Sequence, residues 1–256
     1  MKDLLLTVLR NEEIGRGVYE LTLQADKLPE IKAGQFVNLE AGRADLILRR
    51  PFGLHSWDYM RNTFKVAFDV KGKGTEVLKE AKVGQKLQAI LPLGKSFPEV
   101  AKGKKIMLVG GGTGVLPLLA VAQSHTGCEI YAFLGFGDKS AVIKEKEFSK
   151  CCKQTIIATD NGSYGEKGFV TDSVKKLYDW IKPDYIFGCG PPLMMKALAP
   201  YTKTSEIYVT IEAHMACGVG VCLVCACAIN RGGETEFKRT CKDGPVFRFE
   251  EVFYES

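Results

Sequence analysis

The chain has 256 residues, 46% of them hydrophobic and 25% charged, a composition that excludes wholesale disorder and allows one to three domains with buried cores. Its net charge of +5 comes from mixed rather than clustered signs, and no apolar run reaches the roughly 18 residues of a membrane span, so neither nucleic acid nor a membrane is expected as a partner. The apolar start at 4–9 is cut off by Arg10 and lacks a small-residue cleavage site, so we interpret it as the first β-strand of an unprocessed, cytoplasmic chain.

Residues 1–100 carry the pattern of an antiparallel β-barrel. Residues 63–70 alternate in polarity, which places the even-numbered residues, all Phe or Val, on one face of a strand. Other short strands separated by glycine turns are expected at 18–23 and 35–39, and a short helix at 76–81. Short strands with this punctuation predict a small barrel.

Residues 101–205 change to alternating strands and helices. A buried-strand run at 105–109 leads into glycines and then into a helix at 115–124. The alternation predicts a doubly wound, mostly parallel sheet, that is, an α/β nucleotide-binding domain. Its further strands are expected at 129–134, 154–159 and 185–188.

The cysteines are the most informative residues of the chain. Their number is odd, and five of the nine lie close to the C-terminus. Clustered thiols in a chain without a secretion signal favour metal binding over disulfides. The nine are Cys128, Cys151, Cys152, Cys189, Cys217, Cys222, Cys225, Cys227 and Cys241.

Four tail cysteines have the spacing of a plant-type [2Fe–2S] site, C-x4-C-x2-C with a distant fourth cysteine. The predicted ligands are Cys217, Cys222, Cys225 and Cys241. Gly218 and Gly220 give the first loop the freedom to curl around the sulfides and to point N–H groups at them. We therefore predict that residues 206–256 form a small iron–sulfur domain.

The spacing fits other roles of these thiols less well. Zinc also accepts four thiolates, but zinc sites usually pair two short Cys-x-x-Cys hooks, and Cys241 stands alone. Choosing Cys227 in place of Cys225 would lose the x2 hook, so Cys227 is interpreted as a packed thiol. The cysteines at 128, 151 and 152 are interpreted as buried or surface thiols.

Two segments of the α/β domain predict a nicotinamide nucleotide site. Glycines at the turn from the first strand to a helix let the backbone approach a pyrophosphate, although a tight structural turn is the alternative. A second glycine-containing segment follows the strand at 185–188, where ligands of open α/β sheets bind. The expected contacts are Gly111, Gly112, Thr113, Gly114, Cys189, Gly190 and Pro191. Cys189 would shape the pocket, with an inert strand-end thiol as the alternative.

The barrel segment carries two phosphate-friendly features. Arg49 and Arg50 lie at the end of a predicted β segment, and an arginine can bind phosphate through charge-assisted hydrogen bonds. Residues 71–75 open the predicted short helix with glycines and lysines, which is a favourable anion position. In a barrel that precedes a nucleotide-binding domain, the two together indicate a flavin nucleotide.

Taken in order, these motifs resemble the ferredoxin-reductase flavoprotein family and, within it, the electron-transfer subunits of NAD-dependent dihydroorotate dehydrogenase. The similarity spans nearly the whole chain and is most specific at 212–222 and 241–247. Further matching motifs lie at 33–37, 48–52, 72–75, 92–97 and 189–191.

The resemblance implies FAD in the barrel, a [2Fe–2S] cluster in the tail and NAD as co-substrate. It also implies a partner, a catalytic dihydroorotate dehydrogenase subunit with a flavin-containing barrel, in a hetero-tetramer. No acid–base residue is required at the nicotinamide step, and none is predicted. The implied FAD contacts are Arg50, Pro51, Phe52, Gly53, Ala67, Phe68, Asp69, Gly74 and Thr75.

Three residues depart from or refine the family pattern. Gly53 stands where the family usually has Ser or Thr, and Asp69 stands where a basic residue is common. Asp138, after the second strand of the α/β domain, would repel a 2′-phosphate, which favours NAD over NADP.

Electron transfer from dihydroorotate to NAD⁺ in pyrimidine biosynthesis is the function that the resemblance implies. The first alternative is a flavin and iron–sulfur NAD(P)H reductase subunit that serves ferredoxin, sulfur compounds or hydrogenase. The second, of another class, is a zinc-binding interaction module.

Overall fold

A computed structural model describes residues 1–253, and these fall into two units between which the chain alternates. The first unit consists of residues 1–96, 212–227 and 238–245, and the second holds the rest. The tail beyond residue 211 thus contributes to both units. The domain boundaries predicted from the sequence, 1–100, 101–205 and 206–256, stay predictions.

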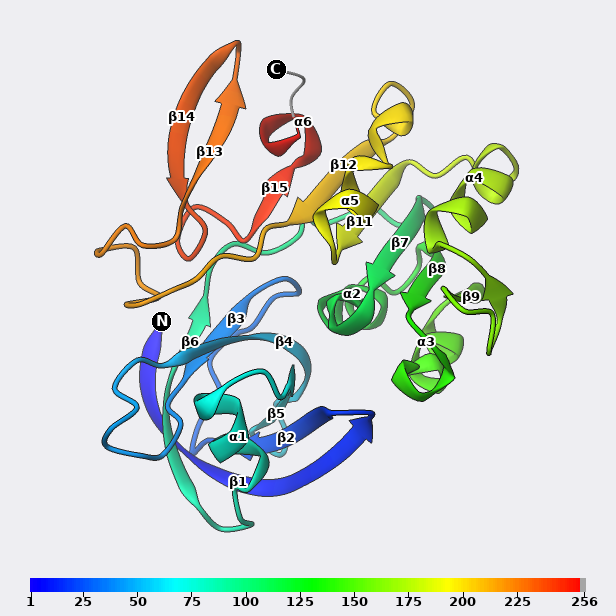
Figure 1. Ribbon diagram of the computed structural model, residues 1–256. Helices are drawn as coiled ribbons and strands as arrows, with labels where there is room; N and C mark the ends of the chain where they lie inside the picture. Colours follow the sequence, from blue (N-terminus) through cyan, green and yellow to red (C-terminus); the bar gives the residue numbers. More distant parts are fainter. Residues whose placement is uncertain (254–256) are drawn as a thin grey trace. The chain divides into compact units, whose positions relative to one another are not determined.

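The first unit is built on a closed six-stranded barrel with the strand order β1-β2-β5-β4-β3-β6 (Figure 1). All neighbouring strands pair antiparallel, which confirms the predicted N-terminal antiparallel barrel. Its strands are β1 (Lys2–Gly15), β2 (Val18–Gln24), β3 (Phe36–Leu39), β4 (Arg50–Asp58), β5 (Thr63–Asp69) and β6 (Lys86–Leu93).

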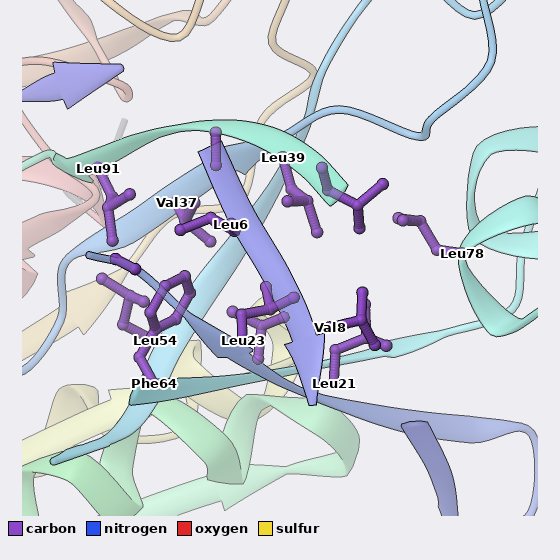
Figure 2. Close-up of a cluster of buried hydrophobic side chains, with 14 of the residues drawn as sticks. Leu6, Val8, Leu21, Leu23, Val37, Leu39, Leu54, Phe64, Leu78 and Leu91 are labelled. Carbon is purple, nitrogen blue, oxygen red and sulfur yellow. The ribbon is translucent and has the colours of Figure 1, made fainter. Parts of the chain in front are cut away.

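The interior of the barrel is filled by side chains that alternate along the strands (Figure 2). Phe64, Val66 and Phe68 of β5 are all buried in this core, as the period-2 pattern predicts. Val70 follows the end of β5 and packs against the same core while half-buried. Because one face of each strand is committed to the interior, the residues between these lie on the outer face of the barrel.

Two local predictions in this unit were wrong in position. The helix expected at 76–81 is α1 (Lys73–Lys79). It begins earlier because Thr75, at the third helical position, closes the first turn: its hydroxyl accepts from the backbone N–H groups of Gly72 and Lys71, at 3.1 and 3.0 Å. Arg50 begins strand β4 rather than ending a β segment. Residues 40–49 before it are irregular, so the Arg50 side chain lies at the entrance of the strand.

The second unit contains a seven-stranded sheet with the order β10-β9-β8-β7-β11-β12-β15. All neighbours pair parallel except β15, which runs antiparallel to β12. The predicted mostly parallel α/β sheet is therefore confirmed. Its strands are β7 (Lys105–Gly111), β8 (Glu129–Phe136), β9 (Gln154–Thr159), β10 (Glu166–Lys167), β11 (Tyr185–Cys189), β12 (Glu206–Thr210) and β15 (Val246–Arg248).

Helices cover both faces of this sheet (Figure 1). The face formed by Met107, Val109 and their neighbours packs against α4, and α5 and α6 add Met195 and Phe249 to the same core. The other face carries α2, which packs on β7 and β11, and α3, which packs on β9. The helices are α2 (Val115–Ser124), α3 (Glu145–Cys151), α4 (Val170–Ile181), α5 (Pro192–Lys196) and α6 (Phe249–Val252).

The tail also forms a two-stranded hairpin of β13 (Ala226–Arg231) and β14 (Glu234–Arg239). Gly232 and Gly233 make its turn with φ of +66° and +90°, a conformation that glycine adopts at little cost. In residues 1–253, no helix has both the length and the apolar character needed to cross a membrane.

Candidate cofactor sites

The first predicted ligand, Cys217, lies in a loop that folds back around its own sulfur. Backbone N–H groups of Val219 and Val221 lie 3.4 Å from Cys217 Sγ, and that of Cys222 lies 3.5 Å away. The loop achieves this curvature because Gly218 and Gly220 adopt φ of +70° and +86°. Three backbone N–H groups thus point at this sulfur from the protein itself.

These N–H groups change the acidity of the thiol. Burial works to raise the pKa of Cys217, but the backbone N–H groups of Cys222, Val219 and Val221 outweigh it and lower that pKa to about 6. The thiolate is the form that ligates iron, so the loop favours the ligating form of this cysteine near neutral pH.

Two further predicted ligands, Cys225 and Cys241, lie together against the barrel. Both are 2% exposed and belong to an apolar cluster with Phe36 and Leu93. The Cys241 N–H points at Cys225 Sγ over 3.5 Å. Burial, with the neighbouring Cys225 thiol next, raises the pKa of Cys241 to about 12.

Asn38 of β3 fastens the Cys217 loop to the barrel. Its Nδ2 donates to the Cys217 carbonyl at 3.3 Å, and the side chain is only 1% exposed. A Cβ atom on Gly218 would lie 2.5 Å from Asn38 Nδ2, so the close approach requires glycine there. Gly218 therefore gives the loop its curvature and also allows its close attachment to Asn38.

The residues present fit a [2Fe–2S] cluster in donor type and in backbone. The four thiols stand as two adjacent pairs, Cys217 with Cys222 and Cys225 with Cys241, and in residues 1–253 no three of His, Cys, Asp or Glu are drawn into one closed ligand group. A cluster has two irons and needs two pairs of thiolates, and amide N–H groups around the sulfurs stabilise its negative charge. The four cysteines stay predicted ligands.

The remaining cysteines have other surroundings. Cys227 lies on β13, and its sulfur accepts from the Thr240 hydroxyl at 3.6 Å, which leaves Cys225 as the thiol next to Cys241. Cys152 is buried, and this burial, more than the neighbouring Cys151, raises its pKa to about 12. All nine thiols are free of disulfides.

The structure brings two of the predicted FAD segments together. The Arg50 guanidinium lies over Gly74 in α1, so closely that a Cβ atom on Gly74 would come within 2.0 Å of Arg50 Nε. Arg50 Nη1 also donates to the carbonyls of Leu46 and Leu48. A charged fork held at the start of a helix is suited to a phosphate group.

The other predicted FAD residues divide between the two faces of the barrel. Phe52 and Phe68 turn inward, with ring centroids 5.1 Å apart, and pack with the core. Pro51, Gly53 and Ala67 alternate with these and belong to the outer face. Only the outer-face residues can present side chains to a flavin, so Phe52 and Phe68 would contact it through backbone atoms.

Asp69 and Thr75 are engaged locally. The Asp69 carboxylate pairs with Lys71 Nζ at 2.9 Å, and a cation therefore does lie beside the acidic residue that departs from the family pattern. The Thr75 hydroxyl donates to the Gly72 carbonyl at 2.9 Å, which stabilises the turn before α1.

The two predicted nicotinamide nucleotide segments touch each other in the second unit. A Cβ atom on Gly114 would lie 2.5 Å from the Cys189 carbonyl oxygen, and one on Gly111 would lie 2.8 Å from Pro191 Cδ. Close packing of the turn against the end of β11 and the segment after it thus explains why both positions require glycine. Gly112 differs, because its φ is +56° and a Cβ atom there would face open space, which leaves its backbone accessible to a ligand.

Asp138 lies at the carboxyl end of β8, as expected for a ribose-binding position. Its Oδ1 accepts from the Ser140 N–H at 2.8 Å and from the Ser140 hydroxyl at 2.6 Å. These bonds hold the carboxylate against the turn at 138–140.

Sequence reasoning missed several residues of these sites. Asn38 was hidden in an apolar strand, although a lone amide among buried residues is itself a signal. On the outer barrel face, the buried Glu20 carboxylate contacts the half-buried Lys65 at 2.7 Å and the buried His55 at 3.3 Å. This cluster lies next to Ala67, which pairs with Glu20 across the strands. The Arg239–Asp243 ion pair, described below, brackets Cys241 at an i, i+4 spacing.

Comparison with known proteins agrees with these observations. A family model described as the iron–sulfur cluster binding domain of dihydroorotate dehydrogenase B matches residues 212–253. The electron transfer subunit of dihydroorotate dehydrogenase B (NAD(+)) from Geobacillus thermodenitrificans is 39% identical over 96% of this chain and 97% of its own length. The subunit of the same name from Streptococcus mutans is 34% identical over 98% of both chains.

Among solved structures, an NADH-dependent reduced ferredoxin-NADP oxidoreductase, studied for flavin-based electron bifurcation, superposes with a TM-score of 0.85. It is 29% identical, and the alignment covers 97% of this chain and 89% of that one. The ferredoxin reductase of carbazole 1,9a-dioxygenase, at 19% identity and a TM-score of 0.68, shares the fold.

A closed antiparallel barrel, a parallel α/β sheet and a cysteine-bearing tail define a ferredoxin-reductase-like protein with an iron–sulfur binding domain. Within that class, the chain belongs to the family of electron transfer subunits of dihydroorotate dehydrogenase B (NAD(+)). The family resemblance and the fold class predicted from the motifs are both confirmed.

Proposed function

We propose that this chain serves the passage of electrons from dihydroorotate, oxidised in a partner catalytic subunit, to NAD⁺ in pyrimidine biosynthesis. The observation that carries the proposal is the full-length relationship to electron transfer subunits, together with four thiols arranged as two adjacent pairs in the matched tail. The family relationship does not support the zinc-binding interaction module that the cysteine spacing alone left open.

Each part of the chain has a defined task in this proposal. When bound, FAD and the [2Fe–2S] cluster supply the redox chemistry that joins one-electron carriers to a hydride acceptor. Cys217, Cys222, Cys225 and Cys241 would hold the cluster. Arg50 would hold the FAD phosphates, and the outer barrel face would support the flavin ring.

The second unit would bind NAD⁺ through the turn at 111–114 and the segment at 189–191. The open backbone at Gly112 and the fixed Asp138 carboxylate support this assignment, because a carboxylate accepts hydrogen bonds from a free ribose but repels a 2′-phosphate. No side chain is assigned a proton-transfer role.

We also propose a cytoplasmic location and a hetero-tetramer with the catalytic subunit. Nine free thiols support a reducing compartment, because disulfides persist mainly in oxidising ones.

The test is co-expression with a catalytic dihydroorotate dehydrogenase subunit, followed by anaerobic purification. We expect one FAD and one [2Fe–2S] cluster per chain, and dihydroorotate-dependent reduction of NAD⁺. A complex that binds both groups but reduces ferredoxin and not NAD⁺ would favour the reductase alternative. A colourless protein without flavin and sulfide would overturn the proposal.

Two cysteine variants test the ligand assignment in the same preparation. Cys225→Ala removes the buried thiol beside Cys241 and should abolish cluster iron, whereas Cys227→Ala removes a thiol bonded to Thr240 and should leave iron unchanged. Iron retained in the first variant and lost in the second would mean that Cys227 is the ligand.

A further inference from the structure

An ion pair brackets the last predicted cluster ligand. Arg239 Nε lies 2.9 Å from Asp243 Oδ2 and Arg239 Nη2 lies 3.2 Å from Asp243 Oδ1, so the contact is bidentate. The Arg239 N–H also donates to Asp243 Oδ2 at 2.9 Å. Because Cys241 lies midway between them, its turn is closed by this pair.

The backbone reinforces the same turn. The Arg239 carbonyl accepts from the N–H groups of Lys242 and Asp243, at 3.0 and 2.7 Å. At its far end, the Gly244 carbonyl accepts from Lys95 N–H at 2.6 Å, which fixes the turn to the end of the barrel. The turn therefore has little freedom once the ion pair is formed.

Arg239 has a third contact, and it reaches the other ligand loop. Arg239 Nη1 donates to the Gly220 carbonyl at 3.1 Å, in the loop whose N–H groups surround Cys217. Gly220 itself packs on Lys242, so closely that a Cβ atom on Gly220 would lie 2.7 Å from Lys242 Cδ. One guanidinium thus joins the loop of Cys217 and Cys222 to the turn of Cys241.

The contacts place the Arg239 charge beside both ligand segments. The guanidinium lies between the Asp243 carboxylate, two residues after Cys241, and the Gly220 carbonyl in the loop around Cys217. The Arg239 side chain is 32% exposed and that of Asp243 is 23% exposed, so the charge is only partly screened by water.

We propose that Arg239 and Asp243 are positioning residues of the cluster site: Arg239 holds the two ligand loops in register and its charge raises the reduction potential of the cluster, while Asp243 orients that charge and partly offsets it. This inference rests on the proposed function, because it needs the cluster to be present. The physical basis is that net charge and hydrogen bonding around an iron–sulfur cluster set its potential.

Three variants separate the charge from the geometry. Arg239→Gln removes the positive charge, Arg239→Lys keeps the charge but loses the two-pronged contact, and Asp243→Asn keeps the guanidinium but removes the offsetting negative charge. Arg231→Gln is the matched control, because Arg231 lies on the same hairpin and pairs with Glu251 rather than with Asp243.

The measurements are iron and sulfide per chain and the cluster reduction potential, read by anaerobic titration with electron paramagnetic resonance. We expect the potential to fall in Arg239→Gln, to rise in Asp243→Asn, and to stay at the wild-type value in Arg239→Lys and Arg231→Gln. We expect Arg239→Lys to retain less cluster after dilution than wild type, because the bond to Gly220 is lost.

Each outcome bears on the inference separately from the proposed function. Wild-type potentials in Arg239→Gln and Asp243→Asn, with the cluster intact, would overturn it and leave the proposed function standing. If Arg239→Gln loses its iron, the potential of Asp243→Asn decides, and an unchanged value overturns the inference. Wild-type protein that never contains a cluster would instead contradict the proposed function.

Discussion

Arg50 and Gly74 show how one missing Cβ atom determines the position of a charge. The guanidinium occupies the space that any larger residue at position 74 would fill. Gly74→Ala should therefore displace Arg50 from the start of α1 and weaken FAD binding roughly tenfold, because a hydrogen bond to a charged group contributes about 1.5 kcal/mol. The dissociation constant is measured by recovery of flavin fluorescence on dilution of the purified protein.

Gly72→Ala provides the control for this prediction. Gly72 lies two residues earlier, has extended backbone, and a Cβ atom there would meet nothing within 4 Å. It should bind FAD as wild type does. Equal affinity in both variants would show that Arg50 does not contribute to FAD binding.

At this scale the sequence predicted residue types better than it predicted their supports. The four cysteines follow from spacing alone, since the ligand pattern is a property of the chain order. The Glu20–His55–Lys65 cluster could not be predicted this way, because strands β2, β4 and β5 bring its members together only when the barrel closes. Asn38 could not be predicted either, because its partner, the Cys217 carbonyl, is remote in the chain.

Asp184 joins the starts of two parallel strands, β7 and β11. Its carboxylate accepts from Lys104 Nζ at 2.7 Å and from the Lys105 N–H at 2.8 Å. The Lys104 side chain, and after it the Lys105 N–H, lowers the pKa of Asp184. Asp184→Asn should therefore lower the free energy of unfolding by about 1 kcal/mol near pH 7, a value reduced for partial exposure.

The pH dependence of this effect has a defined sign. A carboxyl whose pKa is lower in the folded state stabilises the fold above its unfolded pKa, and the stabilisation is lost as pH falls through the folded pKa. Urea unfolding of wild type and Asp184→Asn should therefore differ at pH 7 and converge below the ordinary Asp value of 3.8. A difference that persists unchanged at pH 2.5 would contradict the electrostatic origin.

Whole elements were predictable where periodicity is strong and less so elsewhere. The strands β2, β5 and β9 match their predicted positions within one residue, because alternation or a continuous apolar run marks them. The hairpin of β13 and β14 was not predicted, although two strand-like runs flank Gly232 and Gly233, which is the signal for such a turn.

At the scale of the whole molecule, the tail is distributed over both units. Residues 212–227 and 238–245 belong to the barrel unit, where Cys225 and Cys241 cover Phe36 and Leu93. β15 and α6 belong to the other unit, where β15 extends the sheet beside β12 and Phe249 enters its core. The sequence alone showed a separate cysteine-rich segment, because the packing partners of its apolar residues are remote in the chain.

A truncation after residue 211 tests whether the tail is structural as well as cofactor-binding. We expect it to destabilise both units by several kcal/mol, because burial of each large apolar side chain contributes about 1.5–3 kcal/mol and both units lose such contacts. Hydrogen exchange should then accelerate in β12 of one unit and β3 of the other.

The full-length Cys217→Ser, Cys225→Ser variant separates the two roles of the tail. It lacks two predicted cluster ligands but keeps the tail, so β12 should stay protected in it. Unchanged protection of both strands in the truncated chain would show that the tail is an independent appendage that only binds the cofactor.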